Sequence, residues 1–352
     1  MYKQASRAPE TDFARGFTFV ELMVGMALLL LLLGIIVTIF DQLQNVSDAA
    51  ATMADVNQNL RGAVNVMARD VSMTGWNVPL NGIPLPCGGS ATTIKRPPVS
   101  ASNTFPCSCP CNMTVITTGT GLGPASGSNT TDMITAISVN SSTSATATVS
   151  AITFTPPNSA VITVPSTLTS LVVAGQLIML TNTNGSCLLA ASAVNTSNNT
   201  ITFNASDTTN DVMGLNQFAT NITSGSLAQL KSGGTFPTIT ASLITMVTYY
   251  LSTATSPEQL MRLTGSGASS TGGAQAAALG IQILQISYDL STGAANQRTG
   301  TIPTNNIRNV NLSITAVANH PNRKSRAYYT DTINTQVTVQ NLAYFNKYGT
   351  SY

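Results

Sequence analysis

The sequence predicts an α+β fold in which a long N-terminal helix packs on an antiparallel, β-rich globular head. Three observations support this prediction. A continuous apolar segment extends from Phe17 to Phe40. A one-sided helical pattern of apolar residues follows it directly. From Asp132 onward, the chain consists of short apolar or alternating runs separated by turn residues, which is typical of strands.

The apolar segment is long enough to cross a membrane. It has 19 uncharged residues from Leu22 to Phe40, and a helix from Phe17 to Phe40 would span roughly 36 Å, compared with about 30 Å for a bilayer core. Lys3, Arg7 and Arg15 precede it and favour a cytoplasmic N-terminus. No small-residue cleavage site follows Phe40. The segment is therefore expected to be retained as a transmembrane half-helix, residues 17–40.

The helix is expected to continue beyond the membrane as an amphipathic half, residues 41–75. Gly75 and Pro79 supply the stop signal, so the expected helix runs from Phe17 to Met73, roughly 85 Å. Its stripe is expected to pack on the head, although a coiled-coil seam would show the same spacing. The stripe consists of Leu43, Val46, Ala50, Met53, Val56, Leu60, Val64, Met67 and Val71.

The rest of the chain divides by composition. Residues 76–131 are rich in Cys, Pro and Gly and predict an irregular, disulfide-stapled loop region, and residues 132–352 predict the β-rich head. Asn184-Gly185 is expected to form a hairpin turn, and residues 265–274, GSGASSTGGA, a flexible loop. The expected strands are MITAISV, ATATVSAITFT, AVITV, QLIMLTN, CLLAASAV, TITFN, ITMVTYYLS, QLMRLTG, IQILQISYDL, VNLSITAVA and TQVTVQNLAYF.

The charge content is low and gives no nucleic-acid-binding surface. Only 8% of the 352 residues are charged, with a net charge of +2, against about 25% in a typical soluble protein. This favours equally a subunit packed among others and a low-charge extracellular β-protein. Because the chain has no basic stripe, nucleic acid is not an expected partner.

The five cysteines predict disulfides in an oxidising compartment rather than a metal site. The spacing of CSCPC and the lack of a matching second pair fit a zinc site poorly, and no metal or other cofactor is expected. Because the count is odd, one thiol should remain unpaired or link two chains. The candidates are Cys87, Cys107, Cys109, Cys111 and Cys187.

Glu21 is an unexpected carboxylate at the head of the apolar segment. A lone acid there could simply reach the membrane interface. However, Gly16, Phe17 and Glu21 in RGFTFVELMV form the pattern G-F-x-x-x-E. This pattern resembles the type IV prepilin family with its class III signal sequence. The resemblance implies that prepilin peptidase removes a leader, residues 1–16, by cutting between Gly16 and Phe17, that the Phe17 amine is methylated, and that Glu21 pairs with a neighbouring subunit's terminal amine in the filament.

Three further blocks resemble PilW-like minor pilins. They are ARDVSMTGW at residues 68–76, the Gly-led block from Val172 to Val194, and YYLS…QLMRLTG…GIQILQISYDL. In the last block, Tyr249, Tyr250, Arg262 and Tyr288 occupy the recurring places. Gln176 departs from the family pattern, which usually has an acid there, and VQNLAYF departs from its usual Arg-Asn ending.

Two groups of charged residues are expected to be structural. Arg69 and Asp70 are adjacent on the helix, point about 100° apart and should anchor the helix end to the fold rather than pair with each other. Arg323, Lys324 and Arg326 are expected to form a solvated hairpin tip, where three charges would hold a phosphate only weakly.

An enzyme is not expected. The chain has one histidine, His320, and none of the G-x-S-x-G, H-E-x-x-H, P-loop or dinucleotide-binding motifs. The resemblance instead implies a minor pilin that initiates the pilus or lies at its tip and supports pilus biogenesis, adhesion or twitching motility. The alternatives are a J-type pseudopilin of type II secretion and a membrane-anchored surface adhesin.

The resemblance also implies location and partners. The chain would lie in the inner membrane with a cytoplasmic N-terminus and then enter the extracellular filament. Its partners would be the membrane itself, prepilin peptidase, the inner-membrane assembly platform, other minor pilins and the major pilin.

Overall fold

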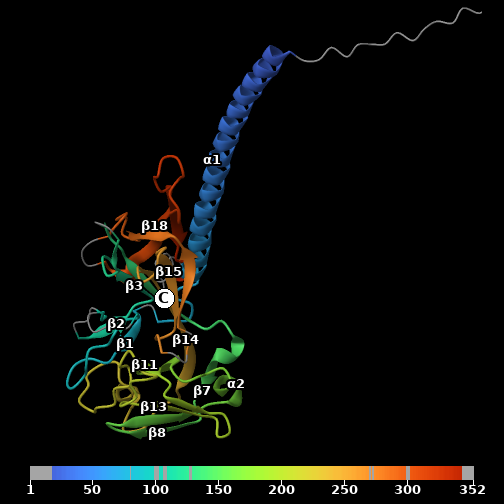
Figure 1. The fold of residues 1–352 in the computed structure, drawn as a ribbon. Coiled ribbons are helices and arrows are strands. Elements are labelled where there is room, and N and C mark those ends of the chain that lie inside the picture. Colours follow the sequence, from blue (N-terminus) through green and yellow to red (C-terminus); the bar gives the residue numbers. More distant parts are fainter. Residues whose placement is uncertain are drawn as a thin grey trace, which may run out of the picture.

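The structure is an α+β protein in which one long helix extends from a β-rich head (Figure 1). The computed structural model describes residues 18–79, 81–98, 103–105, 109–126, 129–268, 271, 273–298 and 302–342. The predicted fold class is therefore confirmed. The expected leader, residues 1–16, lies outside the described residues.

Helix α1, Phe19–Ser72, is a single helix of 54 residues. A capping box begins it: the Thr18 hydroxyl accepts a hydrogen bond from the Glu21 N–H, and the Glu21 carboxylate accepts one from the Thr18 N–H. It ends one residue before the predicted Met73. Gly75, with φ at +82°, then takes a left-handed conformation that disfavours other residues.

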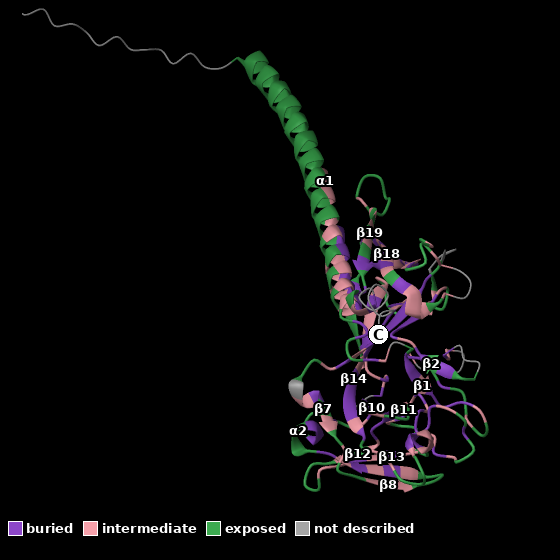
Figure 2. Cartoon of the chain, turned by 180° about the vertical axis from the view of Figure 1, so that it is seen from behind, coloured by how far each residue is buried: buried purple, intermediate pink, exposed green. Residues whose placement is uncertain are grey.

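The two ends of α1 have different surroundings. Its N-terminal half is exposed throughout, whereas its C-terminal half is buried on one side against the head (Figure 2). Leu43 and Val46 belong to the predicted stripe but remain 61% and 68% exposed. The stripe therefore packs on the head only over its C-terminal part, because the head does not reach the first residues of the amphipathic half. The buried residues of α1 are Val56, Leu60, Ala63, Met67 and Val71.

An antiparallel three-stranded sheet covers the buried side of α1. It has the order β17-β18-β19, and β18 and β19 contact the helix. Residues such as Leu284, Leu312 and Ile314 are buried in the same hydrophobic core as Leu60 and Met67. The strand bounds are Ile281–Leu290, Ile307–Val317 and Thr330–Thr338.

A second sheet of eight strands forms the centre of the head. Its main path is β11-β10-β14-β15-β16, and β6 and β7 pair with the other edge of the long strand β14, with β3 outside β6. The bounds are Ile116–Gly119 for β3, Met133–Val139 for β6, Thr146–Thr148 for β7, Leu177–Asn182 for β10, Gly185–Ala190 for β11, Thr240–Ser252 for β14, Gln259–Thr264 for β15 and Ala274–Leu279 for β16.

Strands β10, β11 and β14 are buried on both faces. Leu177 and Met179 belong to the core that contains the helix, whereas Ile178 and Leu180 belong to a second core. Successive side chains point to opposite faces of a sheet, so the two cores lie on its two sides. This explains why QLIMLTN is a continuous apolar run rather than an alternating one.

A four-stranded sheet closes the second core at the end of the head farthest from the N-terminus of α1 (Figures 1 and 2). Its order is β12-β13-β9-β8. The bounds are Ala151–Thr155 for β8, Ser159–Thr163 for β9, Ala193–Asn195 for β12 and Thr200–Asn204 for β13. Short helices occur at Ser166–Thr169 (α2), Thr143–Ala145 (η1), Leu227–Leu230 (η2) and Thr304–Asn306 (η4).

The predicted loop region, residues 76–131, contains more strands than expected. Beside β3, it forms two small ladders, β1 with β2 and β4 with β5. These strands have two to four residues, too few to show a periodicity. Their bounds are Ile83–Leu85, Cys111–Met113, Ala125–Ser126 and Asn129–Thr130.

Several expected strands have different bounds in the structure. ATATVSAITFT divides into β7 and β8, and CLLAASAV into β11 and β12. Strand β19 ends at Thr338, and residues 340–342 form a helical turn because Leu342 turns into the core, where it is 2% exposed. The hairpin turn lies at Thr183-Asn184, since Gly185 already pairs with Asn182.

The prediction of a flexible loop at residues 265–274 is wrong at both ends of that segment. Ser266 and Ala268 are fully buried, and the Ser266 hydroxyl donates a hydrogen bond to the Gly175 carbonyl at 2.9 Å. At the other end, Ala274 begins β16, which pairs with β15. This packing against the Gly175 turn and the pairing with β15 are long-range contacts that composition does not reveal.

Candidate functional site

The candidate site is the N-terminal end of α1, where Glu21 lies in the apolar segment. Its Oε2 atom accepts hydrogen bonds from both the N–H and the hydroxyl of Thr18, each at 3.0 Å. Its Oε1 atom accepts none from the described residues. The carboxylate is exposed, so one oxygen remains available to a cation from outside the chain. Gly16 and Phe17, the other residues of the G-F-x-x-x-E pattern, lie outside the described residues.

The surface around Glu21 is apolar, and no other described part of the chain packs on it. Phe19 is 76% exposed, and the leucine run from Leu28 to Leu33 is exposed at every position. The most apolar window of the helix has a mean hydropathy of 2.9, with none of it buried. Within the described residues, one helix, near the N-terminus, is long and apolar enough to cross a membrane.

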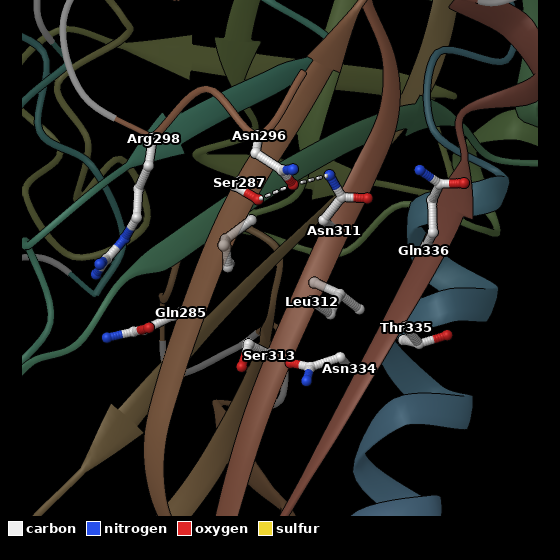
Figure 3. Close-up of a pocket in the computed structure, with 11 residues that line it drawn as sticks. Gln285, Ser287, Asn296, Arg298, Asn311, Leu312, Ser313, Asn334, Thr335 and Gln336 are labelled. Atoms are coloured by element: carbon white, nitrogen blue, oxygen red, sulfur yellow. Dashed lines mark hydrogen bonds between the residues drawn. The ribbon is translucent and has the colours of Figure 1, made fainter.

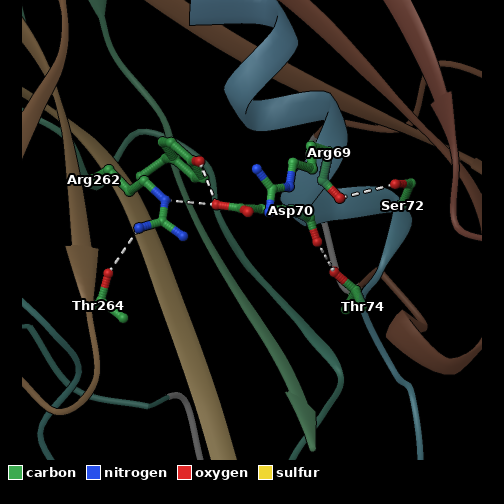
Figure 4. Close-up of polar contacts among 7 residues, drawn as sticks. Arg69, Asp70, Ser72, Thr74, Arg262 and Thr264 are labelled. Carbon is green, nitrogen blue, oxygen red and sulfur yellow. Dashed lines mark hydrogen bonds and ion pairs between the residues drawn. The ribbon is translucent and has the colours of Figure 1, made fainter. Parts of the chain in front are cut away.

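A polar junction at the other end of the helix fixes α1 to the central sheet (Figure 4). The Asp70 Oδ2 atom accepts a hydrogen bond from the Tyr249 hydroxyl at 2.6 Å and forms an ion pair with the Arg262 Nε at 2.7 Å. Arg262 also donates to the Thr264 hydroxyl at 2.9 Å. Asp70 therefore anchors the helix end to the fold, as predicted for the Arg69-Asp70 pair, whereas Arg69 is exposed.

The electrostatics of this junction follow from burial and from the Asp70 charge. Burial, with the hydrogen bond to Asp70, raises the pKa of Tyr249 above its usual range. The hydrogen bond to the Asp70 carboxylate raises the pKa of Arg262. Both residues therefore keep their protons at neutral pH. Asp70 and Arg262 come from sequence blocks quoted above for the PilW-like resemblance, and the fold brings them together.

A second polar junction, which no sequence pattern predicted, lies inside the head. Arg96 is fully buried, and its guanidinium donates to the Thr118 and Thr117 carbonyls at 2.7 and 2.9 Å and to the Thr135 hydroxyl. Burial lowers its pKa to about 10. Gly119 allows the approach, because a Cβ there would lie 2.8 Å from the guanidinium. Composition predicted an irregular loop for the surrounding segment, so nothing in the sequence indicated a buried arginine.

Asp132 forms part of this interior as well. It is 1% exposed and forms an ion pair with Arg298 at 3.1 Å. It also accepts backbone hydrogen bonds from Gly121 and Ile286 at 2.8 and 2.7 Å. These contacts satisfy both carboxylate oxygens, and the residue joins three segments of the head.

A polar recess of about 400 Å³ lies on the β17-β18-β19 sheet (Figure 3). Amides and hydroxyls line much of it, including Gln285, Asn311 and Gln336. Asn311 and Ser287 hydrogen-bond to the Asn296 side chain, and Asn311 and Gln336 also donate to Asp289. Asn311 and Asn296 thus hold each other in place, and Asp289 fixes Asn311 and Gln336. Among the described residues, no three His, Cys, Asp or Glu side chains are grouped to hold a metal ion.

The cysteines form disulfides, as predicted. Cys87 is bonded to Cys109, and Cys111 is also disulfide-bonded, whereas Cys107 lies outside the described residues. Cys187 is free and fully buried, and burial raises the pKa of its thiol to about 12. Of the two fates expected for the odd cysteine, the unpaired thiol is the one observed, since a buried sulfur cannot reach another chain.

The geometry defines a protein with one exposed apolar N-terminal helix and a disulfide-containing β-rich head. Comparison with known families, curated proteins and solved structures finds no match. Any more specific function therefore depends on the residues themselves.

Proposed function

We propose that this chain is a minor pilin of the type IV pilus, of the PilW-like kind. In this proposal, prepilin peptidase cuts after Gly16, the Phe17 amine is methylated, and α1 holds the subunit in the inner membrane until it is drawn into the filament. The observation that carries the proposal is an apolar half-helix, exposed throughout, that places one carboxylate close to the new terminus.

The proposed assembly contact combines apolar burial with one directed ion pair. Side chains such as Leu29 and Leu30 are 58% and 68% exposed, and their burial between subunits would give non-directional attachment. An ion pair between the Glu21 Oε1 and a neighbour's terminal amine would fix the axial register, because attraction strengthens in a low-dielectric interior. Leaving either charge alone there would be costly.

Head size supports a place in initiation or at the tip of the filament. The head contains three substantial sheets and extends well beyond the end of α1 (Figure 1). A bulky head is best accommodated where no subunit stacks above it. Immunogold label on a pilus-producing strain should appear at filament ends, and label along whole filaments at the density of the major subunit would contradict this placement.

Mass spectrometry of the mature N-terminus tests the class of protein. We expect a chain that begins with N-methylphenylalanine at Phe17. An intact Met1, or a cut beyond Phe40, would exclude the proposal. A J-type pseudopilin would share this terminus, so a deletion strain separates the two: a pilin deletion should impair piliation, and a pseudopilin deletion should impair secretion.

A further inference from the structure

The hairpin between β18 and β19 extends back along α1 toward the membrane end of the helix. Its loop, residues 318–329, is the red segment that runs beside the blue helix in Figure 1. Asn322 and Lys324 line a recess together with Gln42 and Val46 of α1. The loop therefore lies level with the first residues after the apolar segment.

The near end of this recess lies within the headgroup layer of a bilayer. Gln42 and Val46 lie two and six residues beyond Phe40, which is roughly 3 and 9 Å along the helix. Each headgroup layer is about 5–7 Å thick, since the whole bilayer measures about 40–45 Å and its core about 30 Å. The recess that Lys324 lines extends to Met53, roughly 20 Å from Phe40, so the loop faces the bilayer surface from just outside the headgroup layer when α1 spans a membrane.

The loop concentrates positive charge. Arg323, Lys324 and Arg326 occur within four residues and are all exposed. None forms a salt bridge with the part of the chain that the structure describes. Neighbouring Tyr328 is 56% exposed, and tyrosine is enriched at membrane interfaces.

Hydrogen bonds within the loop fix its backbone conformation. The Asn322 side-chain oxygen accepts hydrogen bonds from the N–H groups of Lys324 and Ser325 at 3.0 and 3.1 Å. The Asn322 carbonyl accepts a further one from the Arg326 N–H at 2.8 Å. The three basic side chains therefore lose little backbone freedom on binding.

The acids nearby do not cancel this charge at the membrane. Asp48 and Asp55 line a recess beside the loop together with Arg323, but they lie eight and 15 residues beyond Phe40, roughly 12 and 22 Å from the apolar end. Only Asp41 lies at the boundary itself. Lys324 lines the recess that reaches Gln42, whereas Arg323 lines the recess that contains Asp48 and Asp55.

We propose that the β18-β19 loop docks on the anionic phospholipid headgroups of the membrane that α1 crosses, holding the head against the bilayer surface. This proposal goes beyond filament assembly and requires only that α1 span a membrane. Basic residues near an anionic bilayer each contribute roughly fivefold to such docking, so three would contribute on the order of a hundredfold.

The test uses the full chain in nanodiscs with a fluorophore on the loop. Ala327→Cys provides the attachment point, because Ala327 is exposed and its side chain makes no hydrogen bond; the native thiol of Cys187 is buried. A headgroup-linked quencher should quench the probe strongly in discs with phosphatidylglycerol and weakly in discs of phosphatidylcholine alone. Salt near 1 M should remove the difference, since the screening length is then about 3 Å.

Two matched triple variants separate this loop from general charge. Arg323→Gln, Lys324→Gln and Arg326→Gln together should abolish the quenching in anionic discs, with the unfolding temperature unchanged. The control Arg61→Gln, Lys95→Gln and Arg308→Gln removes the same charge from other exposed positions and should leave quenching intact. Equal quenching in both lipids, or equal loss in both triple variants, would overturn the proposal.

Discussion

At the scale of single residues, the contact that most depends on the fold is the one between Asp70 and the central sheet. Asp70 lies in the last turn of α1, and its partners Tyr249 and Arg262 lie 179 and 192 residues later. The Asp70 side chain is 15% exposed and that of Arg262 is 29% exposed, so water screens the pair only in part. Removing one partner leaves the other charge half-buried without compensation.

The Asp70→Ala variant tests this contact. Loss of the ion pair and of the Tyr249 hydrogen bond should lower the free energy of unfolding by about 2–4 kcal/mol. Arg69→Ala is the matched control, since Arg69 is adjacent and exposed and should change stability by less than about 0.5 kcal/mol. Equal effects in urea titrations of the two variants would contradict the assigned anchor.

Cys187 offers a second test at this scale. Its sulfur is fully buried and the pKa of its thiol is raised to about 12, so it is neither accessible nor ionised at neutral pH. An alkylating reagent should leave Cys187 unmodified in the native protein and modify it after denaturation without reduction. Peptide mass spectrometry reads the difference, and rapid native labelling would show that β11 opens locally.

At the scale of elements, α1 combines two environments in one uninterrupted helix. Val56 to Val71 stabilise the head by apolar burial, whereas the segment before them contributes nothing to the core of the single chain. Its exposed leucines indicate a lipid or protein environment outside the chain. This half of the helix is therefore the part of the chain for which we propose contacts with other molecules.

Glu21→Gln tests that intermolecular role. The amide can still accept a hydrogen bond from Thr18 but cannot pair as an anion with a terminal amine, so the variant should stay in the membrane and enter filaments at least tenfold less often. Asp41→Asn removes an acid just after the apolar segment and should incorporate normally. Immunoblots of sheared filaments measure both, and normal incorporation of the Glu21 variant would contradict the proposed contact.

At the scale of the whole molecule, two cores share one sheet and two buried tyrosines limit its pH range. Burial is the main cause that raises the pKa values of Tyr249 and Tyr288 in the folded state. Above pH about 10, the unfolded chain loses these protons and the folded chain keeps them. Stability is therefore fully present below that pH and falls as the pH rises further.

Alkaline unfolding measures this effect on the intact chain in detergent. Each tyrosine should lower the free energy of unfolding by about 1.4 kcal/mol per pH unit above pH about 10, and tyrosinate absorbance from the two residues should appear together with unfolding. Tyr288→Phe should halve the slope that the pair contributes. Ionisation of both residues before any loss of β-structure would show that they are not enclosed as described.

Local sequence patterns predicted the end of the long helix and the bounds of several strands well. The helix end was correct to one residue, and MITAISV, TITFN and IQILQISYDL match β6, β13 and β17 at both ends. The misses have a common cause. The strand β16, AQAAAL, has alanines that favour a helix, and it is a strand because it pairs with β15; the buried Arg96 likewise depends on carbonyls that only folding brings near.

The sequence by itself determined the apolar helix, its capping carboxylate and the strand content of the head, because these follow from side-chain periodicity and local hydrogen bonding. Only the tertiary structure decided which residues hold Asp70, which cysteine stays unpaired, and that a basic loop returns to the membrane end of α1. Those outcomes depend on contacts between residues far apart in the chain, which no local pattern records.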